Sequence, residues 1–474
     1  MSKLERLGSL DMTWLQIERE TNLMQVVGVL VLETPLDRQR LETLLRARLL
    51  RLERFSQHVL RDSAGAIWES GQVDMSAHIV DLPLPAGDEQ AALEAVVSEL
   101  AATPLDPQRP LWQLHLVGQY RQGSALIVRI HHCIADGIAL ISVTLSLVDG
   151  GSEPPQRRAK PAHDAGSPEE WLADTLIRPF TDMAVKAIDM AGESAAHSLH
   201  LLREPEKMLE QGLAGSVEAA RMAYQLVSDA AALALMPDDS ATRLKGKPGH
   251  AKRVAWCPPI PLDEVKAIGK ALNCSVNDVL LSCVAGAIGG YLRAQGDDPA
   301  GQEIRAMIPV NLRPMEQAWK LGNHFGLVPL VLPIGIENPI ERVYEVRQRM
   351  NALKGSTQPL LAFAMLSMAG MLVKPAQDAL LNLFARKTTA VMTNVPGPRD
   401  ALTLCGARVT QCMFWVPQSG DIGLGVSILS YGGGVQFGVI TDTTLCPEPQ
   451  QIIDAFAPEF DQLSLLTLML PWGE

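Results

Sequence analysis

The sequence has few cysteines, and none of them is arranged in a recognisable pair. Seven cysteines are dispersed over 474 residues, and no C-x-x-C motif occurs. An odd and scattered set provides neither a disulfide framework nor a zinc site, and it is typical of a reducing compartment. We therefore expect a cytoplasmic protein without a structural metal.

Long apolar runs and an excess of positive charge are also missing. No segment approaches the roughly 20 apolar residues that a membrane-spanning helix needs, and the first residues, MSKLERLGSLDMTW, lack the apolar core of a signal peptide. The formal net charge of −12 argues against nucleic acid as a partner, because phosphate binding needs a basic face. We expect the protein to be soluble or to lie on a membrane surface, with the inner face of the membrane and the lipid droplet as the candidate surfaces.

What the chain does contain is typical of a large α/β protein. Apolar residues make up 47% and charged residues 20%, and the length exceeds what one hydrophobic core supports. β-branched and apolar runs predict strands at 25–33 and within 113–130, whereas residues 149–170 are rich in proline, glycine and charge and predict a linker. Residues 171–236 have the three- and four-residue spacing of helices. The resulting division is a first lobe at 1–150, a linker and helical connector at 151–250, and a second lobe at 251–474.

The most informative stretch is IVRIHHCIADGIAL, from Ile127 to Leu140. An apolar strand leads directly into His131 and His132, and Asp136 and Gly137 follow. Because consecutive side chains of a strand point to opposite faces, the two histidines should have different surroundings. The later apolar spacing predicts a helix just after Gly137.

His132 at the end of that strand is a candidate general base, because the unperturbed pKa of histidine lies near neutrality. Asp136 could orient His132 directly, but only three residues separate the two and these must also turn into the helix. We therefore predict that Asp136 is chiefly structural and pairs with an arginine, for which Arg313 in PVNLRP is the first candidate. Gly137 would permit a tight turn or the close approach of a substrate. A purely structural role for the histidines is the alternative.

Other chemistries fit less well. Two neighbouring strand residues diverge, and no H-x-x-x-H or H-E-x-x-H motif supplies further metal ligands. No G-x-S-x-G motif provides a serine nucleophile. If His132 is a base, the nucleophile should arrive with the substrate, as an acceptor hydroxyl does when it attacks an activated acyl group.

The motif HHCIADG has the form H-H-x-x-x-D-G, and with three further motifs it resembles bacterial wax ester synthase/acyl-CoA:diacylglycerol acyltransferases. These motifs are PLW at Pro110–Trp112, ND at Asn277 and Asp278, and TNVPGP at Thr393–Pro398. The first motif is shared with condensation domains and the chloramphenicol acetyltransferase superfamily, whereas NVPGP with PLW upstream is more specific. The family often has serine at the position of Thr393, so the hydroxyl is kept.

This resemblance extends over nearly the whole chain and carries several expectations. It implies two chloramphenicol-acetyltransferase-like lobes with a tunnel between them that reaches the histidine. It implies acyl-CoA as the donor, a long-chain alcohol or diacylglycerol as the acceptor, and no metal or prosthetic group. His131, His132, Asp136 and Gly137 are then the catalytic candidates. Substrate-binding candidates, which could donate to the oxyanion, are Asn277, Thr393 and Asn394.

The residues themselves also allow simpler interpretations of these motifs. Asn277 could be an ordinary first-turn residue of a helix capped by Ser275 and ended by Gly296. Trp112 is most simply a core or lobe-interface anchor. YGGGVQFG, residues 431–438, predicts a hairpin, because no G-K-[ST] follows to complete a phosphate loop.

The sequence thus favours an O-acyltransferase with His132 as general base and leaves two other functions open. One is a condensation-type enzyme that uses carrier-bound acyl groups. The other is a non-catalytic lipid-binding protein. The helical segment 171–236 would connect the lobes, with peripheral membrane contact as its second possible role.

Overall fold

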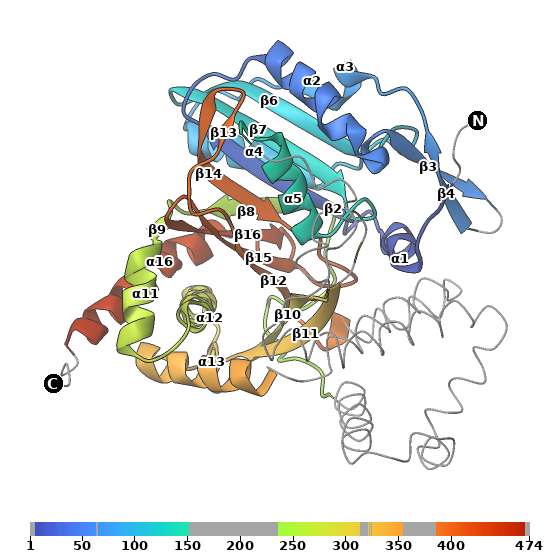
Figure 1. Cartoon of the computed structure of the whole chain (residues 1–474). Helices are drawn as coiled ribbons and strands as arrows, with labels where there is room; N and C mark the ends of the chain where they lie inside the picture. The colour runs from blue at the N-terminus through green and yellow to red at the C-terminus, as the bar shows by residue number, and fades with distance from the viewer. Residues whose placement is uncertain are drawn as a thin grey trace, which may run out of the picture.

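The computed structural model describes residues 5–62, 65–150, 236–312, 321, 323, 325–353 and 385–469. Within them the chain forms two α/β lobes, each built around its own sheet (Figure 1). A third, three-stranded sheet, in the order β1-β4-β3, lies at the margin of the first lobe. Its strands are β1 (Glu5–Arg6), β3 (Gln57–Asp62) and β4 (Gly65–Ser70).

The first lobe has a six-stranded sheet in the order β13-β14-β2-β7-β6-β5. Valine, leucine and isoleucine fill its central strands because both faces are covered. The strands from the first part of the chain are β2 (Gln25–Leu32), β5 (Ile79–Asp81), β6 (Trp112–Tyr120) and β7 (Gly123–His131). β2 and β7 are antiparallel, and Gln25 lies opposite His131. The two strands predicted within 113–130 are confirmed as β6 and β7.

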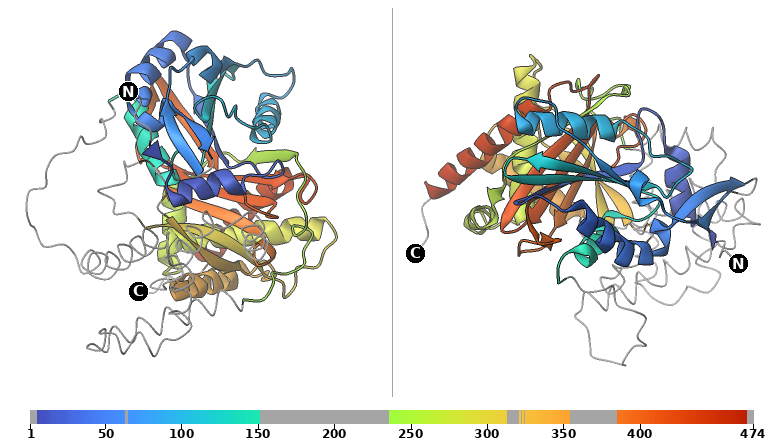
Figure 2. Two further views of the ribbon diagram at one scale, coloured as in Figure 1. Left: turned by 90° about the vertical axis from the view of Figure 1, so that its right-hand side faces the viewer. Right: turned by 90° about the horizontal axis from the view of Figure 1, so that it is seen from above.

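Helices cover both faces of this sheet, as Figure 2 shows from above. α4 packs on one face, and α2 and α5 pack on the other. α5 begins at Gly137, where the sequence predicted a helix. The first-lobe helices are α1 (Ser9–Ile17), α2 (Arg38–Ala47), α3 (Met75–His78), α4 (Glu89–Ala101) and α5 (Gly137–Leu147).

The second lobe has a seven-stranded sheet in the order β11-β10-β12-β15-β16-β8, with β9 paired to β16. Its strands are β8 (Lys252–Trp256), β9 (Ile260–Pro261), β10 (Ile304–Asn311), β11 (Phe325–Leu332), β12 (Ala390–Pro396), β15 (Leu424–Tyr431) and β16 (Gly434–Asp442). Its described helices are α11 (Leu262–Ala271), α12 (Val276–Ala294), α13 (Pro339–Leu353) and α16 (Gln450–Leu468). The predicted hairpin at YGGGVQFG is confirmed as the β15–β16 turn, where Gly432 and Gly433 have positive φ.

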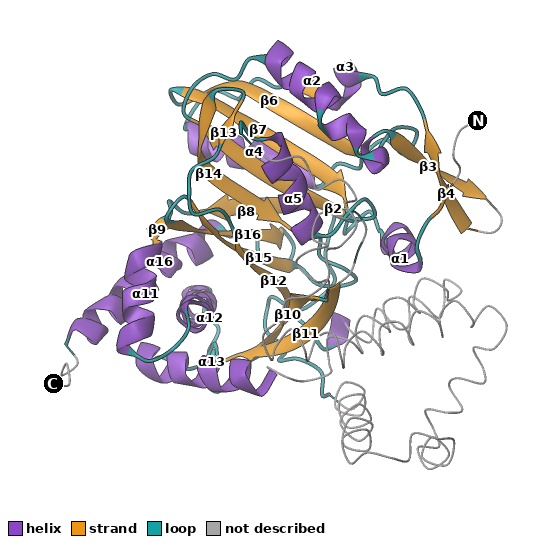
Figure 3. Ribbon diagram, viewed as in Figure 1, coloured by secondary structure: helices purple, strands orange, loops and turns teal. Residues whose placement is uncertain are grey.

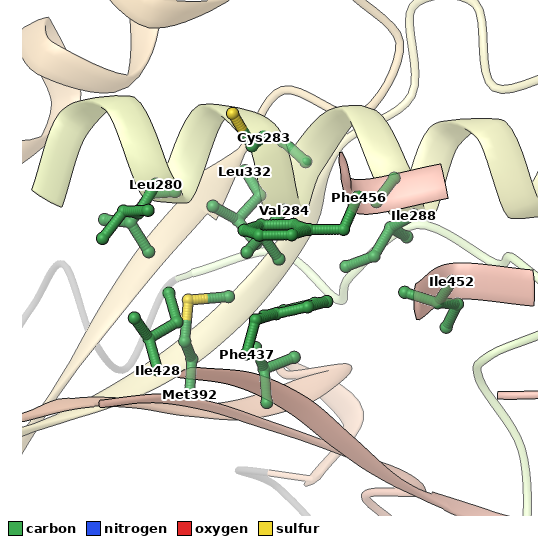
Figure 4. Packing of buried hydrophobic residues seen from close by; sticks show 14 of the residues in the cluster. Leu280, Cys283, Val284, Ile288, Leu332, Met392, Ile428, Phe437, Ile452 and Phe456 are labelled. Atoms are coloured by element: carbon green, nitrogen blue, oxygen red, sulfur yellow. The ribbon is translucent and has the colours of Figure 1, made fainter. Parts of the chain in front are cut away.

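Helix α12 is the centre of the second core. Its apolar side chains face the sheet, where they meet Met392, Ile428 and Phe437, and α16 adds Phe456 (Figure 4). The predicted cap is present, because Ser275 and Asp278 form a reciprocal capping box, and Gly296 follows the helix with φ +84°. No single helix among the described residues is long and apolar enough to cross a membrane; α11 and α12 pass such a test only together, and they meet at 99°.

A strand exchange links the two lobes. After β12 the chain leaves the second sheet, and β13 (Thr403–Leu404) and β14 (Ala407–Trp415) join the first one. β14 runs antiparallel to β2 (Figure 3). In this pairing Cys412 lies opposite Leu30. The division at 1–150, 151–250 and 251–474 does not describe this exchange, because strand pairing is set by spatial contact and not by sequence order. Most of the predicted linker and helical connector, residues 151–235, lies outside the described residues.

Candidate active site

His132 lies immediately after β7 and is 4% exposed. Its backbone N–H donates to the Met24 carbonyl at 2.7 Å. Trp14 of α1 stacks on the imidazole with ring centroids 4.5 Å apart, and Phe325 of β11 lies 5.6 Å away. Trp14 and Phe325 are themselves 5.8 Å apart, so the three rings form one cluster in which the imidazole contacts an aromatic side chain of each lobe.

The chemistry of His132 follows from this burial. Burial lowers the pKa of His132 to about 4, although the negative charge of Asp136 opposes the decrease. The imidazole is thus neutral at pH 7 and has a lone pair that can accept a proton. Its Nδ1 has no hydrogen-bond partner among the described residues, so no carboxylate of the described chain holds the ring as in a serine-protease triad.

His131 has a different position, as the alternation of the strand predicted. The backbone N–H of Cys133 donates to His131 Nδ1 at 3.1 Å, so that Nε2 carries the proton and donates to Glu18 Oε2 at 3.0 Å. Both ring nitrogens are occupied, and His131 holds the loop. This geometry does not support the predicted catalytic role of His131.

Glu18 completes the loop anchor. Its Oε2 also accepts from the backbone N–H of Met24 at 2.9 Å. Burial raises the pKa of Glu18, but the hydrogen bonds from His131 and from the backbone of Met24 oppose burial, and the net pKa is lowered. Glu18 therefore stays ionised at neutral pH. No sequence motif marks this residue, so sequence reasoning missed it.

Asp136 caps helix α5. Its carboxylate accepts from the backbone N–H of Ala139 at 2.9 Å, and the side chain is buried. A capping role keeps the carboxylate at the helix start. The prediction that Asp136 pairs with Arg313 concerns a residue outside the described ones.

Gly137 begins α5 without a positive φ, so the expected tight turn is not the reason for glycine here. A Cβ at this position would meet nothing within 4 Å. Gly137, which directly follows Asp136, lines an apolar cavity. The second expectation, close approach of a substrate, is consistent with this position.

The cavity lies between the first sheet and helices α2 and α5, and its volume is about 170 Å³. β2, β6, β7 and α5 contribute much of the lining, and β14 and the Gly397–Pro398 turn of the later chain complete it. Val26 and Ile130, which lie opposite each other in the sheet, place one end of the cavity next to His131 and His132. The resemblance predicted a tunnel between the lobes; this cavity is instead largely within the first lobe. Trp112 lines it and is buried in the first core, which confirms the structural interpretation of PLW.

The predicted oxyanion candidates are not arranged as expected. Thr393 and Asn394 are consecutive residues of strand β12, so their side chains point to opposite faces. Asn394 Nδ2 donates to Asn277 Oδ1 at 3.0 Å, on the α12 face of the sheet. Asn277 and Asn394 therefore meet, whereas Thr393 is separated from them by the sheet.

Thr393 lies on the face that turns toward the first lobe. Phe325 shares that face and touches His132, and Val395, two residues after Thr393, packs against the first-lobe core. Ser427 lies beside Thr393 on the neighbouring strand β15. It is fully buried, and its hydroxyl has no partner among the described residues. Sequence reasoning missed Ser427, because no motif marks it.

The site also contains a buried amide and a buried acid from distant parts of the chain. Asn323 is 4% exposed, and its Nδ2 donates to the His132 carbonyl at 2.7 Å and to Asp11 Oδ1 at 2.9 Å. Burial raises the pKa of Asp11 to about 6, and the hydrogen bond from Asn323 opposes the rise. The described residues contain no group of three or more metal-ligating side chains.

Comparison with known proteins identifies acyltransferases among the relatives of this chain. The Wax ester synthase/diacylglycerol acyltransferase catalytic domain matches residues 7–280, and the WS/DGAT C-terminal domain matches residues 321–464. A probable diacylglycerol O-acyltransferase of Mycobacterium tuberculosis is 27% identical over 465 residues, which cover 95% of this chain and 93% of that protein. A second, putative one from the same organism is 26% identical and covers 97% of this chain and 96% of its own length.

Solved structures share the fold. The wax ester synthase/diacylglycerol acyltransferase from Marinobacter aquaeolei VT8 has a TM-score of 0.65 at 19% identity, with 98% of this chain and all of that chain covered. The first condensation domain of the calcium-dependent antibiotic synthetase has a TM-score of 0.57 at 14% identity, with 98% and 97% covered. The predicted two-lobed α/β fold is thus confirmed. On the match over residues 7–280, which contains the H-H-x-x-x-D-G motif, the chain belongs to the wax ester synthase/diacylglycerol acyltransferase family of acyltransferases.

Proposed function

We propose that this protein transfers a fatty acyl group from acyl-CoA to the hydroxyl of a long-chain alcohol or diacylglycerol, with His132 as general base. The observation that carries the proposal is a buried imidazole, with no partner for Nδ1 among the described residues, close to an apolar cavity that Ile130 and Gly137 line. Neutrality leaves a lone pair for the proton, and the cavity suits an alkyl chain. Family membership supports both substrate classes.

The proposed reaction balances with this one histidine. His132 accepts the proton of the acceptor hydroxyl while the oxygen attacks the thioester carbonyl and forms a tetrahedral intermediate. The intermediate collapses with cleavage of the C–S bond, and the leaving sulfur takes the proton back from the imidazolium. The products are an ester and free CoA thiol. General-base catalysis of this kind contributes roughly 10²- to 10⁴-fold in rate.

Formation of the imidazolium is the difficult step, because burial disfavours the charged ring. The carboxylate of Asp136 is the nearby charge that favours it. Tight packing of Trp14 and Phe325 excludes water, so the attraction between imidazolium and carboxylate acts through a medium of low polarity. The imidazolium–carboxylate pair of His132 and Asp136 therefore forms only when His132 has accepted the proton.

The cavity is the proposed site of the donor's acyl chain. Its lining is formed almost wholly by aliphatic and aromatic side chains. Burying each methylene contributes about 0.8 kcal/mol. The oxyanion needs a donor about 2.7–3.1 Å away. Of the predicted three, the Thr393 hydroxyl remains a candidate, since Asn394 and Asn277 bond each other on the opposite face. To donate to the oxyanion it would have to give up its long bond of 3.4 Å to the Val426 carbonyl.

Thiol release tests this proposal. Wild-type protein should release free thiol from palmitoyl-CoA when hexadecanol or a diacylglycerol is added, and His132→Ala should reduce the rate at least 10²-fold. His115→Ala is the matched control, because His115 is also buried but lies opposite Ile127, which belongs to the apolar cluster on the α4 face of the sheet, away from the cavity. Equal rates for wild type and His132→Ala would refute the general base.

The same assay separates the two other functions. A condensation-type enzyme would need an acyl group on a carrier protein and would give no product from palmitoyl-CoA alone. A lipid-binding protein would retain the acyl chain without releasing thiol. Because condensation domains share the fold, only activity distinguishes these cases.

Two further parts of the proposal have their own tests. The reaction as written needs no metal or prosthetic group, so the rate should be unchanged by EDTA. A cytoplasmic location with peripheral contact to a membrane or lipid droplet would suit lipid acceptors. Flotation with liposomes tests this contact, with the predicted helical segment 171–236 deleted in the comparison variant.

A further inference from the structure

One amide of the second lobe binds the backbone of the histidine in the first lobe. Asn323 lies two residues before strand β11, and its Nδ2 donates both to the His132 carbonyl and to Asp11 Oδ1. Both bonds cross between the lobes, and Asn323 is almost fully buried. The Nδ2 of this buried amide has specific partners and cannot easily exchange them for water.

These contacts fix the peptide on both sides of His132. The backbone N–H of His132 donates to Met24, and its carbonyl accepts from Asn323. With N–H and C=O both held, the Cα–Cβ bond has a defined direction. Trp14, which stacks on the ring, and Phe325, which contacts it at a tilt of 49°, then limit rotation of the ring. Orientation of the base thus depends on the backbone and on packing.

Asp11 in turn orients Asn323. Asp11 and Trp14 lie on α1 with i, i+3 spacing, so both are on one side of the helix. The acid directs the amide, and the indole supports the imidazole. A carboxylate that accepts from an amide N–H forms a charge-assisted bond, which is stronger than a neutral one.

We propose that Asn323, held by Asp11, is the positioning residue of the catalytic histidine and makes the alignment of His132 depend on contact between the two lobes. This inference rests on the proposed function of His132 as general base. Asn323 and Asp11 do not line the apolar cavity, so they should affect the chemical step and not acyl-chain binding.

The experiment uses the full-length protein with palmitoyl-CoA and hexadecanol. Asn323→Ala should lower kcat on the order of 10²-fold, because small misplacement of a base has effects of this size, while KM for palmitoyl-CoA stays within twofold. Gln411→Ala is the matched control. Gln411 is a buried amide that also donates across the lobes, to the Cys257 carbonyl at 3.1 Å, but it is not in contact with His132. It should lower thermal stability and leave kcat unchanged.

A double-mutant cycle tests the part of Asp11. Asp11→Ala should lower kcat in the wild-type background and have no further effect in the Asn323→Ala background, because the acid acts through the amide. Asp11→Asn keeps an acceptor oxygen and should recover most of the activity. If Asn323→Ala does not fold, the comparison of Asp11→Ala with Asp11→Asn at equal folded fraction decides the question.

Two results would overturn the inference. One is a kcat of Asn323→Ala within twofold of wild type while His132→Ala is inactive. The other is an equal loss of kcat in Asn323→Ala and Gln411→Ala, which would indicate general destabilisation. Failure of the proposed function is a separate result, because His132→Ala would then retain the wild-type rate.

Discussion

Filling the apolar cavity should shorten the acyl chain that the protein accepts. Thr144 lines the cavity from α5, and its hydroxyl bonds the Leu140 carbonyl one turn earlier at 2.9 Å. Thr144→Phe replaces a small side chain by one with about four more heavy atoms, which is the space of about three to four methylenes. Because the cavity measures about 170 Å³, this is a substantial part of it.

The expected effect follows from the transfer free energy of methylenes. If three methylenes of a palmitoyl chain are excluded from the cavity, the binding free energy decreases by about 2.4 kcal/mol, at about 0.8 kcal/mol for each methylene. That corresponds to a decrease in kcat/KM on the order of 50-fold for palmitoyl-CoA. Dodecanoyl-CoA, which is four carbons shorter, should be used at nearly the wild-type rate.

Thiol release with the two acyl-CoAs measures this change, with Thr43→Phe as the matched control. Thr43 lies on the exposed face of α2, and its hydroxyl makes the same bond to the carbonyl four residues earlier, that of Gln39, at 2.8 Å. The control should behave as wild type. A parallel decrease for both acyl-CoAs, or no decrease for either, would show that the acyl chain does not occupy this cavity.

Three further predictions concern stability. Burial is the chief cause that lowers the pKa of His115 to about 4 in the folded protein. Between pH 6.5 and 4 the unfolded chain therefore binds a proton at this histidine that the folded protein does not bind. The free energy of unfolding should decrease by up to about 3 kcal/mol over this range. Asp11, with its raised pKa, acts in the opposite direction below pH 6. His115→Leu should therefore flatten the decrease in Tm between pH 6.5 and 4, and an unchanged slope would contradict the assignment. Glu18→Ala removes the acceptor of His131 and Met24 and should lower the free energy of unfolding in urea by about 1–3 kcal/mol, whereas Glu20→Ala should change it little. Ser275→Ala breaks the capping box of α12 and should cost about 1 kcal/mol, measured as a lower Tm, with Ser275→Asp as the variant that retains a cap.

Local signals predicted the elements that carry the H-H-x-x-x-D-G motif. An apolar β-branched run predicted the strand, and apolar residues at helical spacing predicted the helix after Gly137. The different surroundings of His131 and His132 followed from strand alternation alone. These predictions succeeded because each depends only on residues that are close together in the sequence.

Other parts of the site depend on contacts that no local pattern contains. Thr393 and Asn394 are adjacent in the motif but are separated by the sheet, because β12 continues through them. Asp11 and Asn323 are 312 positions apart, and neither belongs to a motif that marks a site. Their meeting is a property of the way the lobes pack.

The sequence by itself thus determined the fold class, the strand–histidine–helix unit and the family resemblance, and it marked His132 as the candidate base. Only the tertiary structure decided that β14 crosses into the first sheet, that the apolar cavity lies largely within the first lobe, and that His131 is an anchor for the loop. The physical reason is the range of the interactions. Propensity and periodicity act along the chain, whereas burial, hydrogen bonding and pKa depend on residues that folding brings together.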